Sequence, residues 1–176
     1  MRIAVALLAL VVAVPALADE PAPYVRTCAG SQLGDLGRGW RQRAVVAGHV
    51  AFVGIKGSYR RMSTDRLGPG MATPLKVLVV VDPNAAPTVT IAARSRAYTA
   101  LGYNAIRHHG TGVPLADGTR SVRFEACRAD RSREPWNRGT QFGGYFLVAG
   151  ARCVHIEVAT QGTVLRRNLS FGAPCA

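Results

Sequence analysis

Short apolar runs separated by turn residues dominate the chain from position 44 onward. Val-rich runs cover 44–55 and 74–81, and strict alternation of apolar and polar residues marks 88–92 and 121–126. Such runs are typical of β-strands, whose side chains point alternately to the two faces of a sheet. No window of a dozen residues has a convincing helical period, and the best helical candidate is 58–67.

Turn residues divide the later strands from one another. Gly150-Ala151 predicts a hairpin between 142–149 and 152–159, and Gln161-Gly162 predicts a turn before a last strand at 164–171. A further strand is expected at 98–106, and Gly48 inside the first run indicates a bulge or bend. About eight short strands in one chain predict an all-β fold, an antiparallel β-sandwich of Ig-like or jelly-roll-like type.

The N-terminus is typical of a cleaved export signal. Met1-Arg2 is followed by an uncharged apolar run from Ile3 to Val14, and residues 15–18 give the small-x-small pattern of a cleavage site. We therefore expect a signal peptide at 1–18, a flexible leader at 19–27 and one β domain at 28–176. No later apolar run reaches the roughly 18 residues of a membrane span, so a secreted or extracytoplasmic protein is expected.

All four cysteines lie beyond this expected cleavage site, and an even number predicts two disulfides in an oxidising compartment. Alternation along 121–126 and 152–159 predicts that Val122, Phe124, Val154 and Ile156 face the core and that Cys153, His155 and Glu157 lie on the opposite face. If these two strands were antiparallel neighbours, Cys127 would lie opposite Cys153. Glu125 would then face His155, and Arg123 would face Glu157, which are complementary cross-strand pairs. This register predicts a Cys127–Cys153 bond, and Cys28–Cys175 follows by elimination.

The formal net charge of +12 attracts polyanions. Only Lys56 and Lys76 are lysines, so nearly all basic side chains are guanidiniums, which bind phosphate and carboxylate groups in a bidentate way. An arginine bias also arises from GC-rich coding, so the net charge, rather than the high proportion of arginine, indicates an anionic partner. We expect an anionic cell-wall polymer or another protein as partner and possible attachment to the cell surface. An exported chain without an aromatic-basic strand platform is not expected to bind nucleic acid.

The connection at 128–141 is the best candidate ligand-binding segment, because it is long for a link between strands and combines basic, aromatic and amide side chains. The residues expected to contact a phosphate, carboxylate or sugar are Arg128, Arg131, Arg133, Trp136 and Arg138. An alternative is that this loop serves a secreted inhibitor or interaction module.

Catalytic patterns are scarce. The chain has no Gly-x-Ser-x-Gly elbow, and its few carboxylates lie mostly in turn-like contexts. His108, His109 and His155 form an alternative metal site, for a metal-dependent enzyme or a metal-binding protein, but nothing in the sequence brings them together. We expect a binding protein without a cofactor rather than an enzyme.

The second half of the chain resembles uncharacterised small secreted β-sandwich proteins of high-GC Gram-positive bacteria. The matching residues are Asp117-Gly118, 122–127, 142–148, Cys153-Val154 and 170–172 before Cys175. The resemblance implies export and supports the Cys127–Cys153 unit, and it implies no activity.

Overall fold

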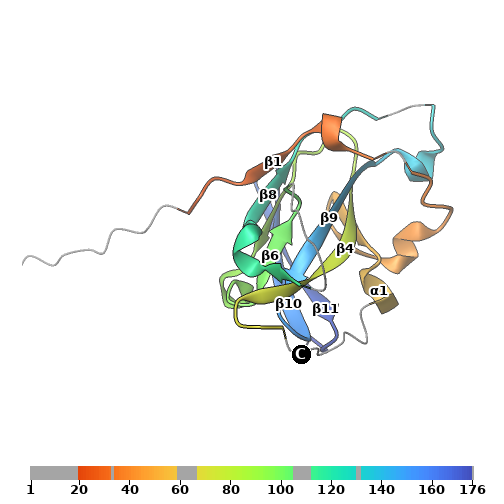
Figure 1. Ribbon diagram of the computed structural model, residues 1–176. Helices are drawn as coiled ribbons and strands as arrows, with labels where there is room; N and C mark the ends of the chain where they lie inside the picture. The colour runs from red at the N-terminus through yellow and green to blue at the C-terminus, as the bar shows by residue number, and fades with distance from the viewer. Residues whose placement is uncertain (1–19, 33, 59–66, 105–111, 130–131, 176) are drawn as a thin grey trace, which may run out of the picture.

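A computed structural model shows the chain as two β-sheets packed face to face (Figure 1). The structure describes residues 20–32, 34–58, 67–104, 112–129 and 132–175. The first sheet, sheet A, has the strand order β1 (Tyr24–Arg26), β8 (Ser121–Phe124), β5 (Thr88–Ile91), β10 (Arg152–Thr160) and β11 (Thr163–Phe171).

The second sheet, sheet B, has the order β2 (Ala44–Ala47), β3 (Val50–Val53), β4 (Met71–Val81), β9 (Thr140–Val148) and β6 (Thr99–Gly102), with β7 (Val113–Pro114) paired to β4. The helical elements are short: α1 (Ile55–Ser58), η1 (Cys28–Gly30), η2 (Trp40–Arg43), η3 (Ala93–Ser95), η4 (Leu115–Asp117) and η5 (Pro135–Asn137). Of the helical candidate at 58–67, residues 59–66 lie outside the described part of the chain.

The predicted all-β, mostly antiparallel sandwich with two disulfides is confirmed. The described residues form eleven strands rather than about eight. Part of the difference lies in the first Val-rich run, which is two strands joined at Gly48, a glycine with φ of +57°. Another part is β1, which pairs in parallel with β8 and includes residues that the sequence placed in the leader.

The predicted hairpin between 142–149 and 152–159 is wrong, because its two strands belong to different sheets. β9 pairs with β4 and β6 in sheet B, whereas β10 pairs with β5 and β11 in sheet A. Gly150, with φ of +75°, lies where the chain crosses between the sheets. A turn between two apolar runs has the same local pattern whether the strands pair or face each other across a core.

The hairpin that does form joins β10 to β11. Gln161 and Gly162 both have positive φ, 48° and 80°, and Thr160 pairs with Thr163 across them. Two successive positive φ values mark the two-residue turn whose twist matches that of antiparallel strands. Nine residue pairs follow from this turn, so β11 is long and forms one edge of sheet A.

The core lies between the sheets and is joined by aromatic contacts. Phe124 of sheet A lies 5.0 Å from Phe142 of sheet B, and Phe171 of sheet A lies 5.3 Å from Phe146 of sheet B, measured between ring centroids. All four side chains are fully buried. These contacts add to the free energy of apolar burial that holds the sheets together.

Both predicted disulfide pairings are wrong. The bonds are Cys28–Cys127 and Cys153–Cys175. The predicted register required β8 and β10 to be neighbours, but β5 lies between them. β8 also ends at Phe124, and Cys127 turns inward, where its side chain is only 7% exposed.

The residues of the predicted cross-strand ladder have other partners. A side-chain oxygen of Glu125 accepts a hydrogen bond from the backbone N–H of Cys28 at 2.7 Å, and Glu157 pairs with Arg166. The first bond links the segment after β1 to the end of β8 beside the Cys28–Cys127 disulfide. The second belongs to the surface described below.

The expected signal peptide lies outside the described residues. None of the helices in the described part of the chain has the length and apolar character that a membrane span requires. Two disulfides are typical of proteins that fold outside the reducing cytosol.

Candidate anion-binding site

The outer face of the β10–β11 hairpin carries a row of polar side chains. In this register His155 lies opposite Asn168, and Glu157 lies opposite Arg166. The alternate residues Val154, Ile156 and Val158 are buried in the core. This confirms the sequence prediction that His155 and Glu157 face away from the core, as the alternation of a strand requires.

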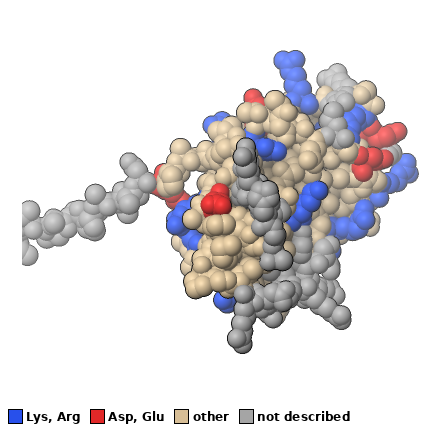
Figure 2. Space-filling view, in the orientation of Figure 1, with Lys and Arg blue, Asp and Glu red and all other residues tan. Residues whose placement is uncertain are grey.

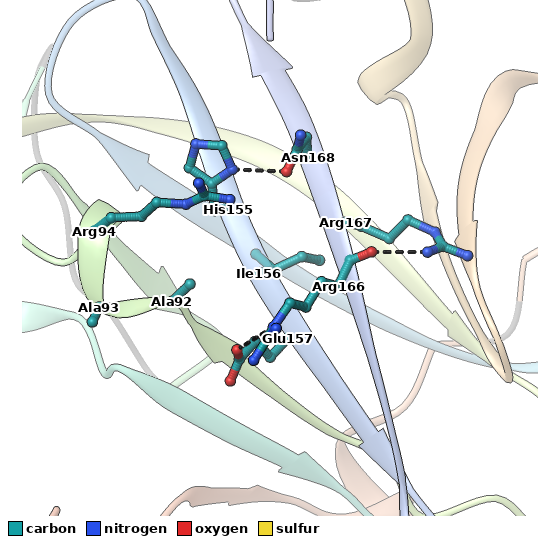
Figure 3. A pocket seen from close by; sticks show the side chains of 9 residues that line it. All are labelled: Ala92, Ala93, Arg94, His155, Ile156, Glu157, Arg166, Arg167 and Asn168. Carbon is teal, nitrogen blue, oxygen red and sulfur yellow. Dashed lines mark hydrogen bonds and ion pairs between the residues drawn. The ribbon is translucent and has the colours of Figure 1, made fainter. Parts of the chain in front are cut away.

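A turn beside β10 brings a further arginine to the same face. After β5, the backbone N–H of Ala92 still donates to the carbonyl oxygen of His155 at 2.9 Å. The chain then turns through η3, and the side-chain oxygen of Ser95 accepts the N–H of His155 at 2.9 Å. The two contacts fix η3 against β10, so Arg94 lies beside His155 (Figure 3).

These elements enclose an open hollow of about 380 Å³, which we call the hairpin hollow. Its lining residues are Ala92, Ala93, Arg94, His155, Ile156, Glu157, Arg166, Arg167 and Asn168 (Figure 3). β10 and β11 form its floor, and η3 with the end of β5 forms one wall. Such a shape fits one charged group of a larger molecule better than a whole enclosed ligand.

The polar contacts inside the hairpin hollow leave donors available. Nδ1 of His155 lies 2.7 Å from Oδ1 of Asn168, and because an amide oxygen only accepts, Nδ1 is the donor in this contact. The Asn168 amide nitrogen makes no hydrogen bond to another described residue. Nε of Arg166 donates to Glu157 at 3.0 Å, with the Arg166 side chain 81% exposed. Its two Nη groups have no acceptor among the described residues.

The charge of the hairpin hollow is positive. Among the described residues that line it, three arginines stand against one carboxylate, Glu157. Arg94 makes no hydrogen bond or ion pair with another described residue, whereas Arg167 donates to the backbone oxygens of Val46 and Arg166. Lys and Arg side chains are also spread over the face in Figure 2, where Asp and Glu are few. The hollow thus combines a favourable field with arginine forks, which suits phosphate or carboxylate.

In the 128–141 loop, which was predicted to bind a ligand, several side chains form hydrogen bonds to backbone carbonyl oxygens of the protein. Arg133, Asn137 and Gln141 all donate to the carbonyl oxygen of Gly34, with Asn137 at 3.1 Å and Gln141 at 2.6 Å. Arg138 donates to the carbonyl oxygen of Arg133 at 3.2 Å. These contacts tie the loop to the segment before η2.

The other predicted loop residues have different positions. Arg128 and Arg138 are exposed, Trp136 lies in η5, and Arg131 lies outside the described residues. Whether the five predicted residues share one binding surface therefore stays a prediction.

The alternative metal site lies mostly outside the described residues, because His108 and His109 are not among them. His155 lies in the hairpin hollow with Asn168 as its contact. Within the described part, no three His, Cys, Asp or Glu side chains gather in a way that could hold a metal ion.

Arg94, Arg166 and Asn168 were not predicted as site residues from the sequence. For Arg166 and Asn168 a signal was present, because a two-residue turn at Gln161-Gly162 sets the register that puts them opposite Glu157 and His155. No comparable local signal exists for Arg94, whose place depends on the contact between Ser95 and His155.

No protein-family model, curated protein or solved structure matches this chain.

Proposed function

We propose that this protein is an exported, non-catalytic binding protein that holds an anionic group of a cell-envelope polymer in the hairpin hollow. The observation that carries the proposal is that Arg94 and Arg166 lie at the open outer face of sheet A in the hairpin hollow, where Glu157 is the one carboxylate among the described lining residues. The net charge of +12, the export-signal pattern and the two disulfides support a role outside the cytosol.

Four side chains of the hairpin hollow have a role in this proposal. Arg94 and Arg166 donate hydrogen bonds to the anionic oxygens, and both approach from different elements, η3 and β11. His155 orients Asn168 through its Nδ1 contact, so that the amide nitrogen of Asn168 is directed to a ligand oxygen. None of the described lining residues is a Ser, Thr or Cys. This set supports binding rather than nucleophilic catalysis.

The test is binding of the purified protein, beginning at Asp19, to isolated cell-wall polymer and to long-chain polyphosphate over a salt series. Arg94→Ala and Arg166→Ala are each expected to weaken binding about tenfold, the value of one charge-assisted contact. Arg123→Ala is the matched control, because Arg123 is exposed on the same sheet but does not line the hairpin hollow. Equal losses in all three variants would leave only a general effect of net charge and would contradict the proposal.

Export is tested separately by fractionating the native host and sequencing the N-terminus of the mature protein. A start at Asp19 in the extracytoplasmic fraction is the expected result. Retention of residues 1–18 in a cytosolic pool would contradict this part of the proposal.

A second candidate function is an interaction module that presents the 128–141 loop to another protein. The observation in its favour is the convergence of Arg133, Asn137 and Gln141 on the carbonyl oxygen of Gly34, because a loop fixed before binding loses less entropy on association. The test is capture of a protein from the extracytoplasmic fraction by the wild type and by an Arg128→Ala/Arg138→Ala variant. Equal capture by both would contradict it.

A further inference from the structure

A second hollow adjoins the hairpin hollow at the edge of the sandwich. It measures about 630 Å³ and lies between β11 of sheet A and the elements around β2 of sheet B. We call it the edge hollow, and its lining residues are Gln42, Arg43, Val45, Ile55, Lys56, Asn168 and Ser170. Among these described residues two are cationic and none is acidic, so the edge hollow also favours an anion.

The two hollows meet at one residue. Asn168 lines both of them, and it is the outward-facing residue that follows Arg166 on β11. A ligand that extends from Arg166 past Asn168 therefore passes from the hairpin hollow into the edge hollow without leaving the protein surface.

A contact between the sheets holds the two hollows in a constant relative position. Arg167, on the inner side of β11, donates from Nε to the carbonyl oxygen of Val46 at 3.1 Å. Val46 lies on β2, the edge strand of sheet B. The bond ties β11, the strand that separates the hollows, to β2, which includes Val45 and directly follows Arg43, so the backbones on the two sides keep their relative position before a ligand binds.

We propose that the ligand is a linear chain with repeated phosphate groups that crosses β11 at Asn168. One phosphate lies between Arg94 and Arg166 in the hairpin hollow, and a later phosphate of the same chain lies at Arg43 and Lys56 in the edge hollow. This inference rests on the proposed function and adds the class of ligand and the direction in which it runs.

The arrangement of the arginines favours phosphate over carboxylate. A planar carboxylate has two oxygens whose lone pairs lie in one plane, so its donors, including a guanidinium fork, approach within that plane. Arg94 and Arg166 come from separate elements and so approach one group from different directions. A tetrahedral phosphate offers further oxygens to a second guanidinium, and Lys56 contacts phosphate as a point charge.

Occupation of both hollows by one chain has a measurable consequence. Once the first phosphate is bound, the second binds in an intramolecular step, and its effective concentration is in the millimolar range for short flexible links. Chain length therefore decides whether the edge hollow contributes to affinity.

The experiment compares three probes: tripolyphosphate, long-chain polyphosphate and polyglutamate of similar charge. The variants are Arg94→Ala, the pair Arg43→Ala/Lys56→Ala, and the control Arg123→Ala. Arg43, Lys56 and Arg123 are all exposed, so these replacements leave the core unchanged. The salt dependence of binding is measured for each probe with the wild type.

Arg94→Ala is expected to weaken both phosphate probes about tenfold. The Arg43→Ala/Lys56→Ala pair is expected to weaken long-chain polyphosphate about tenfold and to leave tripolyphosphate within twofold. The salt slope of the wild type is expected to be steeper for the long chain, because more phosphates are neutralised. Polyglutamate is expected to bind more weakly than long-chain polyphosphate.

Three different results would each overturn a different part of the proposal. If the Arg43→Ala/Lys56→Ala pair changes long-chain binding no more than Arg123→Ala does, the crossing of β11 is wrong while the hairpin hollow remains the binding site. If polyglutamate binds as tightly as polyphosphate, the phosphate preference is wrong. If Arg94→Ala changes neither phosphate probe more than the control, the proposed function itself is wrong.

Discussion

The hydroxyl group of Ser95 accepts the backbone N–H of His155 at 2.9 Å, although the two residues are 60 positions apart in the sequence. The same hydroxyl lies 3.0 Å from the hydroxyl of Tyr98, which in turn donates to the carbonyl oxygen of Cys153 at 3.1 Å. Since a hydroxyl has one proton, Ser95 donates to Tyr98 and accepts from His155. This short chain of hydrogen bonds fastens η3 to β10 and places Arg94 at the hairpin hollow.

Replacement of Ser95 by Ala is expected to lower the free energy of unfolding. Ser95 is fully buried, so the N–H of His155 would lose its acceptor without access to water. The expected cost is about 1–3 kcal/mol of unfolding free energy. Chemical denaturation measures it, with Ser170→Ala as the control, because Ser170 is exposed and its hydroxyl donates to the nearby carbonyl oxygen of Ala173. Equal stability of the two variants would show that the Ser95 contact is not needed.

Replacement of Gly144 by Ala is expected to destabilise the core. A Cβ atom at position 144 would lie 2.3 Å from Cδ1 of Tyr103, whose ring is buried and whose hydroxyl donates to the Val77 carbonyl oxygen at 2.8 Å. The ring cannot move aside without losing this bond, so a cost of about 1–3 kcal/mol is expected. Thermal unfolding measures it.

The control for this variant is Gly68→Ala, where the nearest heavy atom to a new Cβ is Met71 Cγ at 4.0 Å. Gly144→Ala should also cost less in a Tyr103→Leu background, because the smaller side chain leaves room for the methyl group. An unchanged cost in that background would show that Tyr103 is not the cause.

Strand positions could be read from the sequence because they depend on local pattern. The alternation at 121–126 and 152–159 predicted correctly that Val122, Phe124, Val154 and Ile156 are buried. Which strands are neighbours is not a local property. Nothing in the sequence of β8 or β10 indicates that β5 lies between them. The register that paired Cys127 with Cys153 therefore gave complementary charge pairs and was still wrong.

The candidate site also has a part that local sequence predicts and a part that depends on tertiary contacts. The sequence predicts that His155 and Glu157 lie on the outer face of their strand, although it assigned them to a ladder with Glu125 and Arg123. Arg166 and Asn168 follow from them once the Gln161-Gly162 turn fixes the hairpin register. Arg94 and the edge hollow depend on contacts between segments far apart in the chain. The polar residues on the outer face of β10 and β11 could be predicted from the sequence. The packing of η3 and β2 determines which cationic side chains lie beside them.

The two disulfides are expected to contribute unequally to stability. Cys28–Cys127 closes a separation of 99 residues and Cys153–Cys175 one of 22. In the chain-entropy account such loops correspond to about 5 and about 3 kcal/mol. Paired Cys→Ser variants of each bond, compared by denaturant unfolding, should differ in that order. Peptide mapping without reduction should find only these two linkages, and a Cys127–Cys153 peptide would contradict the observed fold.

Glu157→Gln is expected to raise the affinity for polyphosphate with little effect on stability. Glu157 is the one carboxylate among the described residues lining the hairpin hollow, and its ion pair with Arg166 is exposed to solvent on the arginine side. Exposed ion pairs contribute about 0–1 kcal/mol to folding, so the unfolding midpoint should hardly change. Removal of the negative charge frees Arg166 for the ligand and increases the positive field, for an expected gain of about two- to fivefold. Isothermal titration at low salt measures it, and Glu134→Gln, a charge removal outside the hollow, is the control. A loss of affinity in Glu157→Gln alone would show that Arg166 needs its carboxylate partner to bind and would contradict the role given to it here.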